Sequence, residues 1–201
     1  MMFEKKFPLR REILMLVLTP MMLSFVAVGV FFKLFYEPTF GLLSQAYSYF
    51  SGEPLTLLAT QWGAVWGIVI ADAWMWSPFV MLLVLAGLVS VPDYLYEAAE
   101  VDRASKWKRF ITVTFPYVRG LLLLALLFRT IETFKIFDVV YLITNGGPGT
   151  STETIAVYVY RVAFQFFKTS QSSALSYILL FVVIVLTNLY LYFVKKRGEE
   201  G

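Results

Sequence analysis

Long apolar runs separated by short polar segments make up most of the chain. The hydrocarbon core of a bilayer is crossed by about 20 apolar residues in a helix. Three runs reach that length, and a fourth candidate is interrupted by charges, so we predict an all-α, polytopic membrane protein of about four spans. We expect residues 1–201 to form a single transmembrane domain. The predicted spans are residues 13–36, 62–91, 117–144 and 174–194.

The first and third predicted spans differ from a plain apolar helix. The first follows a basic start, as in a signal peptide, but it is longer than the roughly 7–15 residues of a typical signal-peptide core. Pro20 inside it predicts a kink. The third carries charged side chains in its second half and scores poorly by hydropathy. We keep the third span because two basic segments would otherwise lie on opposite sides of the membrane.

Basic residues gather in three segments outside the spans. These segments are the N-terminus, the connection between the second and third spans, and the C-terminus, whereas residues 37–61 include no Lys or Arg. Basic segments face the cytoplasm in most membrane proteins. The sequence therefore predicts a multi-pass protein of the cytoplasmic (inner) membrane with both termini in the cytoplasm. The basic residues are Lys5, Lys6, Arg10, Arg11, Arg103, Lys106, Lys108, Arg109, Arg119, Lys195, Lys196 and Arg197.

The composition agrees with a chain that is surrounded by lipid. Of the 201 residues, 59% are hydrophobic and only 15% are charged, and the mean hydropathy is +0.70. Soluble domains carry about 25% charged residues, which argues against a soluble fold, intrinsic disorder and a nucleic-acid partner. Cysteine and histidine are both absent. Because these residues are common metal ligands, nucleophiles and general bases, we expect no catalytic residue, no metal and no cofactor, and a protein that is not an enzyme.

Four charges of alternating sign recur every three residues in the third predicted span. On one helix they would form a slowly winding stripe in which neighbours pair. Charges at membrane depth usually face the bundle interior or a wet cavity. The stripe predicts either the lining of a polar solute path or a salt-bridge ladder that fixes helix register, and the two are compatible. Asp72 on the second span either lines the same path or pairs with the stripe, which consists of Arg129, Glu132, Lys135 and Asp138.

The connection between the second and third spans, residues 92–116, predicts two short helices. Pro92 suits a helix start, and Ser105 suits the N-cap of the second helix. Pro116 is expected to end that helix. The second helix carries one amphipathic stripe at i, i+3, i+4 and i+7, formed by Trp107, Phe110, Ile111 and Thr114.

Two physical interpretations of this helix–turn–helix stay open. An apolar stripe with mixed charges suits a segment that docks into a groove on another protein. The same basic and aromatic pattern suits an amphipathic hairpin on the membrane surface. Composition and periodicity do not distinguish the two.

The same segment resembles the EAA loop of permease subunits in binding-protein-dependent ABC importers. The family pattern is Glu-Ala-Ala, three residues, Gly, nine residues, then Ile-x-Leu-Pro. Residues 97–99 and Pro116 keep that spacing, while Arg103 stands at the family's glycine. Val113 and Phe115 replace Ile and Leu with other apolar residues. Because glycine serves as a free hinge between the two helices, the geometry of the turn at Arg103 stays open.

A second segment resembles the sugar-type permeases, the class of the maltose and glycerol-phosphate transporters. Residues 137–148 read Phe-Asp, five residues, Thr, one residue, then Gly-Gly-Pro. The Gly-rich run predicts a turn beyond the membrane face. It is not a P-loop, because no Lys followed by Ser or Thr comes after it. We therefore do not expect this chain to bind ATP by that route.

The resemblance implies a transmembrane subunit of an ATP-driven importer for a sugar or related polyol. The partners that it implies are a dimer of ABC ATPase subunits, a second permease subunit, an extracytoplasmic solute-binding protein and the lipid bilayer. Glu97 would make the main contact with the ATPases. The residues implied in this coupling are Glu97, Ala98, Ala99, Asp102, Arg103, Trp107, Phe110 and Ile111. The residues expected along the translocation path are Asp72, Arg129, Glu132, Lys135, Asp138 and Tyr141.

The resemblance covers about residues 11–196 and aligns with the C-terminal part of permeases that have more helices. One or two N-terminal helices are therefore expected to be missing from this chain. An alternative function is that of a truncated, non-transporting assembly or scaffold subunit. A membrane-embedded enzyme is a weaker alternative, because only scattered carboxylates and hydroxyls remain to carry chemistry.

Overall fold

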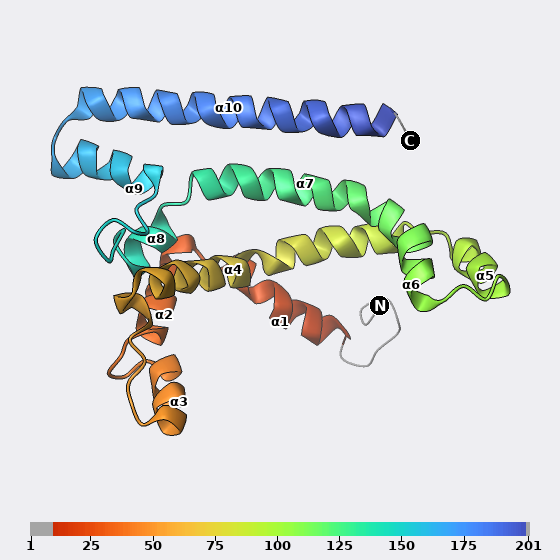
Figure 1. The fold of residues 1–201 in the computed structure, drawn as a ribbon, viewed down its shortest axis with the longest axis horizontal. Helices are drawn as coiled ribbons and strands as arrows, with labels where there is room; N and C mark the ends of the chain where they lie inside the picture. Colours follow the sequence, from red (N-terminus) through yellow and green to blue (C-terminus); the bar gives the residue numbers. More distant parts are fainter. Residues whose placement is uncertain (1–9, 200–201) are drawn as a thin grey trace. The chain divides into compact units, whose positions relative to one another are not determined.

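The computed structural model describes residues 10–199, and every regular element among them is a helix (Figure 1). The predicted all-α fold class is thereby confirmed. The helices gather into two compact units, each described by itself below. The first unit holds the chain up to Met21 together with Trp76–Arg129, and the second holds Met22–Met75 and the chain from Thr130 onward.

The helices follow one another along the chain through short connections. In the first half these are α1 (Arg10–Met22), α2 (Phe25–Phe35), α3 (Leu42–Ser51), the 3₁₀ turn η1 (Leu57–Ala59), α4 (Gln61–Val89) and α5 (Asp93–Val101). They continue with α6 (Lys106–Arg109), the π-turn η2 (Phe110–Thr114), α7 (Phe115–Phe134), α8 (Asp138–Ile143), α9 (Ile155–Tyr160), the π-turn η3 (Arg161–Gln165) and α10 (Thr169–Glu199).

Three helices of the described residues are long and apolar enough to cross a membrane. They are α4, the stretch Lys106–Phe134 that includes α7, and the part Thr169–Tyr192 of α10. The number rises to four if α1 and α2 together form one broken span. This result agrees with the predicted number of spans, and α4 agrees closely with the predicted second span, residues 62–91.

The first predicted span, residues 13–36, is not one helix. α1 ends at Met22 and α2 begins at Phe25. Ser24 caps α2, because its side-chain oxygen accepts a hydrogen bond from the Ala27 N–H at 3.2 Å. A capping serine favours a new helix start over continuation of the previous helix. Pro20 lies within α1, so the interruption follows the predicted kink site.

The prediction of one span over residues 117–144 is wrong. α7 ends at Phe134, and the separate helix α8 begins at Asp138. The four predicted stripe charges therefore do not lie on one helix. The spanning part extends in the other direction instead, back to Lys106.

A distant hydroxyl group helps to explain why α7 ends where it does. The last turn of α7 is closed by a hydrogen bond over three residues instead of four, in which the Lys135 N–H donates to the Glu132 carbonyl at 3.1 Å. The Ile136 carbonyl then accepts a hydrogen bond from Thr154 Oγ1 at 3.0 Å. This partner comes from the far side of α8, so hydrophobic periodicity does not show it.

In the second unit, close contacts join α2 to α8 and to α4. Gly29 of α2 faces α8, and a Cβ atom at Gly29 would lie 2.9 Å from the Leu142 side chain. Tyr36, which is 2% exposed, donates a hydrogen bond from its hydroxyl to the Gly67 carbonyl of α4 at 3.0 Å. Small residues at these places allow helices to approach closely, which is the usual way of packing in lipid.

In the first unit, the C-terminal half of α4 packs against α7. A Cβ atom at Gly87 would lie 3.1 Å from the Val118 side chain. Further along, the Phe79 and Phe128 rings meet edge to face with 6.1 Å between their centroids. Gly87 and Val118 thus join the end of α4 to the start of α7, and the two rings extend the contact to the second half of α7.

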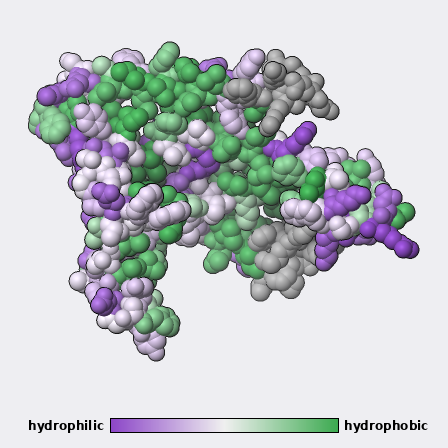
Figure 2. Space-filling model, in the orientation of Figure 1, coloured by the Kyte–Doolittle hydropathy of each residue, from purple (hydrophilic) through white to green (hydrophobic). Residues whose placement is uncertain are grey.

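Apolar side chains cover much of the outside of the long helices (Figure 2). In the spanning part of α10, none of the residues in the most apolar 18-residue stretch is buried, and Phe181 is 67% exposed. Continuous apolar surface of this kind marks contact with a membrane or with other proteins. Lipid or partner helices must therefore cover α10.

We predict that Gly29→Ala destabilises the protein, although alanine is the better helix former. The added methyl group meets the Leu142 side chain. Overpacking of this kind costs about 1–3 kcal/mol, which exceeds the gain of about 0.5–1 kcal/mol from replacing a helical glycine. The melting temperature of the purified protein in detergent should fall.

Gly120→Ala on α7 is the matched control, because nothing lies within 4 Å of the Cβ position at Gly120. That variant should keep the melting temperature or raise it. A melting temperature for Gly29→Ala equal to or above that of Gly120→Ala would contradict the close packing of α2 on α8.

Candidate functional site

The polar segment after α4 begins with helix α5. Pro92 occupies its N-cap, and Asp93 lies in its first turn. A negative charge is favourable near the N-terminus of a helix, where backbone N–H groups are unpaired. The predicted helix start at Pro92 is confirmed.

A Schellman motif ends α5 and places Arg103 just after the helix. The Arg103 N–H donates to the Glu100 carbonyl at 3.0 Å, and the Ala104 N–H donates to the Ala99 carbonyl at 2.9 Å. Arg103 has the left-handed backbone that this motif requires, with a φ of 51°. Glycine is usual there because it lacks the Cβ atom that is strained at positive φ. The turn therefore keeps the geometry of a glycine turn although Arg103 occupies it.

The second helix of the segment starts at Ser105, as predicted. The Ser105 side-chain oxygen accepts a hydrogen bond from the Lys108 N–H at 3.3 Å. The prediction that Pro116 ends this helix is wrong, because α6 continues through η2 into α7 as one helix, Lys106–Phe134. A π-turn shifts the hydrogen-bonding register by one residue. Pro116, which has no N–H to donate, directly follows that shift and is accommodated in the first turn of α7.

Two side-chain contacts hold α5 against the continuous helix. The hydroxyl groups of Tyr96 and Thr114 lie 3.0 Å apart, and Thr114 is 3% exposed. Arg109 forms a salt bridge with Glu100 at 2.7 Å. Because Glu100 is largely exposed, the salt bridge contributes at most about 1 kcal/mol. The hydroxyl pair is the stronger restraint, because Thr114 is buried and a buried polar group left without a partner is costly.

One face of α5 is open to the surroundings. Tyr94 is 64% exposed and Val101 is 83% exposed. Glu97 and Ala98 lie between them and are exposed as well. The spacing i, i+3, i+4 and i+7 places these four side chains on one side of the helix, which we call the α5 face. Ala99, predicted with Ala98 as a close-approach surface, is half-buried.

The remaining predicted coupling residues lie at the turn and on the second helix. Asp102 and Arg103 are exposed at the turn. Trp107 is 70% exposed and stacks on Phe110, with 5.7 Å between the ring centroids. Ile111 is 46% exposed. Figure 2 shows hydrophilic residues gathered over the region of α5 and α6.

The residues predicted along a solute path do not form one group. In the first unit, the Arg129 guanidinium lies over the Trp76 ring, 4.7 Å from its centroid. In the second unit, Lys135 forms a salt bridge with Glu132 at 2.8 Å, which agrees with the predicted pairing of neighbours in the stripe. Asp138 lies apart from them in the first turn of α8.

Asp72 lines a cavity of about 380 Å³ within the second unit. Among the predicted path residues, Asp72 alone reaches this cavity. The other polar groups of this cavity were not predicted, because they lie far from Asp72 along the chain. Hydroxyl groups and carboxylates thus share one cavity with apolar walls, and the polar residues are Asp72, Thr133, Ser151, Thr152, Glu153 and Thr154.

The loop that supplies Glu153 is held by its own polar contacts. Arg161 forms a salt bridge with Glu153 at 2.5 Å, with side chains that are 20% and 16% exposed. The same guanidinium donates to the Asn145 carbonyl. Thr152 Oγ1 donates to the Gly147 carbonyl at 2.8 Å. The predicted Gly-rich turn is therefore confirmed, and its contacts fix the wall of the Asp72 cavity.

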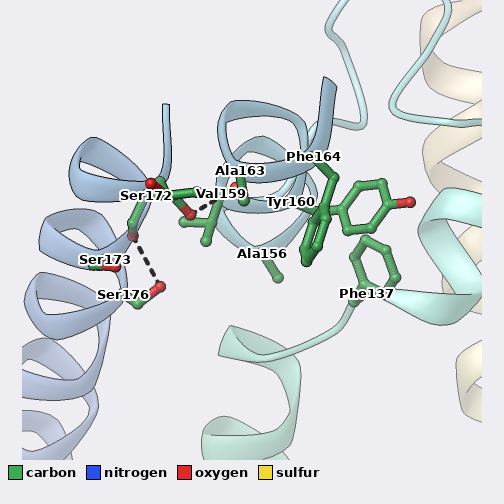
Figure 3. Close-up of a pocket in the computed structure, with 10 residues that line it drawn as sticks. Phe137, Ala156, Val159, Tyr160, Ala163, Phe164, Ser172, Ser173 and Ser176 are labelled. Atoms are coloured by element: carbon green, nitrogen blue, oxygen red, sulfur yellow. Dashed lines mark hydrogen bonds between the residues drawn. The ribbon is translucent and has the colours of Figure 1, made fainter. Parts of the chain in front are cut away.

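A second cavity, of about 410 Å³, lies between α9 and α10 (Figure 3). Figure 3 shows aromatic rings on one side and serines of α10 on the other. The hydroxyls of Ser172 and Ser176 donate to the carbonyls of Val159 and Ser172, both at 3.0 Å. No carboxylate lines this cavity, so it is less suited than the Asp72 cavity to a polar ligand. Its labelled rings belong to Phe137, Tyr160 and Phe164.

Tyr141, the last predicted path residue, belongs to the aromatic cluster beside this second cavity. Its ring stacks on Phe137 and meets the Tyr160 ring, with 5.1 Å between centroids in each pair. A hydrogen bond between the Tyr141 and Tyr160 side chains raises the pKa of Tyr160 above its ordinary value. Within residues 10–199, no group of acidic side chains is placed to hold a metal ion.

Several apolar spanning helices, joined by a folded polar segment, define a polytopic membrane component. The chain belongs to the family described as binding-protein-dependent transport system inner membrane component, whose family model matches residues 1–198. The resemblance found in the sequence is thereby confirmed, and so is the inner-membrane location.

Two relatives from the curated proteins illustrate the family. The trehalose/maltose transport system permease protein MalF of Thermococcus litoralis is 36% identical over 88% of this chain and 59% of its own length. The sulfoquinovosyl glycerol transport system permease protein SmoG of Agrobacterium fabrum is 32% identical over 97% of this chain and 62% of its own length. The chain thus spans about three fifths of the length of these relatives.

Two solved structures share the fold. One is a bacterial ABC transporter involved in the import of the acidic polysaccharide alginate, with a TM-score of 0.85 and 20% identity, over 97% of this chain and 69% of that chain. The other is a bacterial alginate ABC transporter in complex with an alginate pentasaccharide-bound periplasmic protein, with a TM-score of 0.82 and 20% identity, over 94% of this chain and 67% of that chain. At this identity the likeness concerns the fold alone.

We predict that Arg103→Gly stabilises the turn after α5, while Arg103→Val destabilises it. A non-glycine residue at positive φ costs roughly 1–2 kcal/mol, and a β-branched side chain is strained there more than arginine is. Amide hydrogen exchange of residues 98–105 should slow in the glycine variant and quicken in the valine variant. Equal exchange rates in the two variants would show that Arg103 does not hold a left-handed turn.

Proposed function

We propose that this chain is a transmembrane subunit of an ATP-driven ABC importer for a sugar or related polyol, and that α5 couples it to the ATPase subunits. The observation that carries the coupling proposal is the α5 face. An exposed helix side with two apolar anchors, a carboxylate and a small residue suits a groove on another protein. The membrane-surface alternative would place Glu97 toward the lipid side, which is unfavourable for a carboxylate.

The proposed coupling transmits force through side-chain contacts between α5 and the helix that follows it. Two ATPase subunits close on ATP and push on the α5 face. The Tyr96–Thr114 contact and the Arg109–Glu100 salt bridge pass the displacement to the continuous helix Lys106–Phe134. That helix then moves between outward- and inward-facing states. The ATP hydrolysis itself belongs to the partner subunits.

The proposed solute contacts centre on Asp72 and the hydroxyl groups of its cavity. Carboxylate oxygens accept hydrogen bonds from sugar hydroxyls. Thr152 and Thr154 already donate their hydroxyl protons to backbone carbonyls, so they would act toward a solute as acceptors. The remaining path residues, Arg129, Glu132, Lys135, Asp138 and Tyr141, stay predictions. The names of the relatives support a sugar or polyol, because those proteins carry trehalose, maltose or a sugar–glycerol compound in their descriptions.

The proposed partners are an ABC ATPase dimer, a second permease subunit and an extracytoplasmic solute-binding protein. The alginate transporter bound to a periplasmic protein supports the last of these. We further propose that both termini lie in the cytoplasm, which places α5 on the side where ATP is available. The rival proposal is a non-transporting scaffold subunit, and it predicts assembly with the ATPases without uptake.

We predict that Glu97→Arg abolishes coupling and leaves membrane insertion intact. A hot-spot residue of an interface contributes about 2 kcal/mol or more. If Glu97 is such a residue, ATP-dependent uptake by the reconstituted transporter should fall by about tenfold or more. Uptake and membrane content of the variant are measured together in proteoliposomes with the partner subunits.

Glu53→Arg is the control, because Glu53 is an exposed carboxylate outside the coupling segment. It should leave uptake unchanged. Full ATP-dependent uptake by the Glu97→Arg variant would contradict the proposed coupling role. Absence of uptake from the unaltered chain with all partners present would favour the scaffold.

We predict that Asp72→Asn weakens uptake at low solute concentration. A hydrogen bond to a charged group is worth about 1.5–3 kcal/mol, so the half-saturating solute concentration should rise by about 10- to 100-fold. The measurement is the concentration dependence of uptake, with Glu53→Gln as a charge-matched control. An unchanged concentration dependence would remove Asp72 from the solute path.

A further inference from the structure

Helix α3 directs Ser44 of its polar side into the protein, while most of its apolar side is exposed. Ser44 is 1% exposed, and its hydroxyl donates to the Pro38 carbonyl at 2.7 Å while accepting from the Leu55 N–H at 3.0 Å. An amphipathic helix on a water-soluble protein has the reverse arrangement, with its apolar stripe toward the core. The orientation of α3 therefore calls for an apolar environment outside it.

The outward side of α3 is broad and uncharged. Phe50 is 87% exposed, Tyr49 is 85% exposed and Leu42 is 66% exposed. At 3.6 residues per turn, the apolar arc covers roughly 160° of the circumference. No Asp, Glu, Lys or Arg occurs in the helix. The arc consists of Leu42, Leu43, Ala46, Tyr47, Tyr49 and Phe50, and the polar side consists of Ser44, Gln45, Ser48 and Ser51.

Glycine-dependent turns set this orientation at both ends of α3. At the start, a Cβ atom on Gly41 would lie 2.4 Å from the Glu37 carbonyl oxygen, so another residue would not fit. At the end, Gly52 has a φ of 77° and its N–H donates to the Ser48 carbonyl at 2.8 Å. The two hydrogen bonds of Ser44 hold the helix between these glycine turns. A rotation of α3 that turned its apolar side inward would break them.

α3 lies in the chain between two segments that reach the membrane edge. It follows α2, whose last residue is Phe35, and it precedes α4, which begins at Gln61. The first turns of α4 carry Trp62 and Trp66, which are 77% and 57% exposed. Exposed tryptophans near the end of a spanning helix are typical of the membrane–water interface. The chain therefore leaves and re-enters the membrane within reach of α3.

We propose that α3 is an interfacial helix that lies along the bilayer surface and inserts Leu42, Ala46 and Phe50 at the boundary of headgroups and acyl chains. Helices of this type bury their apolar side by roughly 5–10 Å. In the orientation proposed above, the surface is that of the outer leaflet. Lipid is favoured over a protein partner because the exposed side offers aromatic and aliphatic groups but no charge for orienting a partner.

The absence of cysteine from the chain makes the test direct. Phe50→Cys and Ser51→Cys give two neighbouring labels about 100° apart on the helix. Each variant is labelled with an environment-sensitive fluorophore and reconstituted in phosphatidylcholine vesicles, with and without lipids that carry a quencher near the headgroup. The label at position 50 should show several-fold more quenching by lipid than the label at position 51. Iodide in the water should give the reverse order.

Leu42→Cys repeats the measurement at the other end of the arc and should behave as Phe50→Cys does. Thr150→Cys, on the exposed Gly-rich turn, serves as a water-facing control and shows that each preparation has inserted and folded. Equal quenching of positions 50 and 51 by lipid would overturn the proposal. So would a label at position 50 that is shielded only after the solute-binding protein is added, because α3 would then dock a protein. Neither outcome bears on the coupling role of α5.

Discussion

Unbroken helical bonding from Lys106 to Phe134 is the constraint on which the proposed mechanism depends. In lipid, each backbone polar group must find a partner within the protein. The π-turn η2 satisfies that demand while it carries the helix past Pro116. The polar segment after α4 is therefore the first part of a spanning helix, with α5 folded back onto it. A displacement of α5 reaches this helix through the turn at Arg103 and through the side-chain contacts of Tyr96 and Glu100.

The two units give this helix different surroundings. Near α5, a buried hydroxyl pair and a glycine-like turn at Arg103 fix the short helices. Beyond Arg129 the helix enters the second unit, where Thr133 near its end lines the Asp72 cavity. One helix thus connects the proposed coupling face to the wall of the proposed solute site.

Much of this organisation could be predicted from the sequence. Apolar length gave the number of spans, and the Pro92 and Ser105 helix starts follow from local capping chemistry. Residues 97–99 and 137–148 indicated the family that the comparison confirmed. These features depend on a residue and its near neighbours, which is why one sequence suffices for them.

Features that depend on distant partners could not be predicted. α7 ends at Phe134, and the Ile136 carbonyl just beyond it accepts from Thr154, whereas the placement of the basic segments had predicted one span through residue 144. Glu153 joins Asp72 in one cavity although many residues separate them. The inverted orientation of α3 depends on the two hydrogen bonds of Ser44. The left-handed turn at Arg103 is a local feature, but arginine gives no sign of it.

Photocross-linking from Ala98 tests the central claim most directly. Ala98→Cys introduces the single cysteine of the chain, at the centre of the α5 face. A benzophenone attached there should cross-link to an ATPase subunit in the assembled transporter, and the yield should change when ATP is added. The same label at Thr150→Cys should not reach the ATPase. Cross-linking of position 98 to lipid alone, in a complex that still transports, would contradict the proposed coupling.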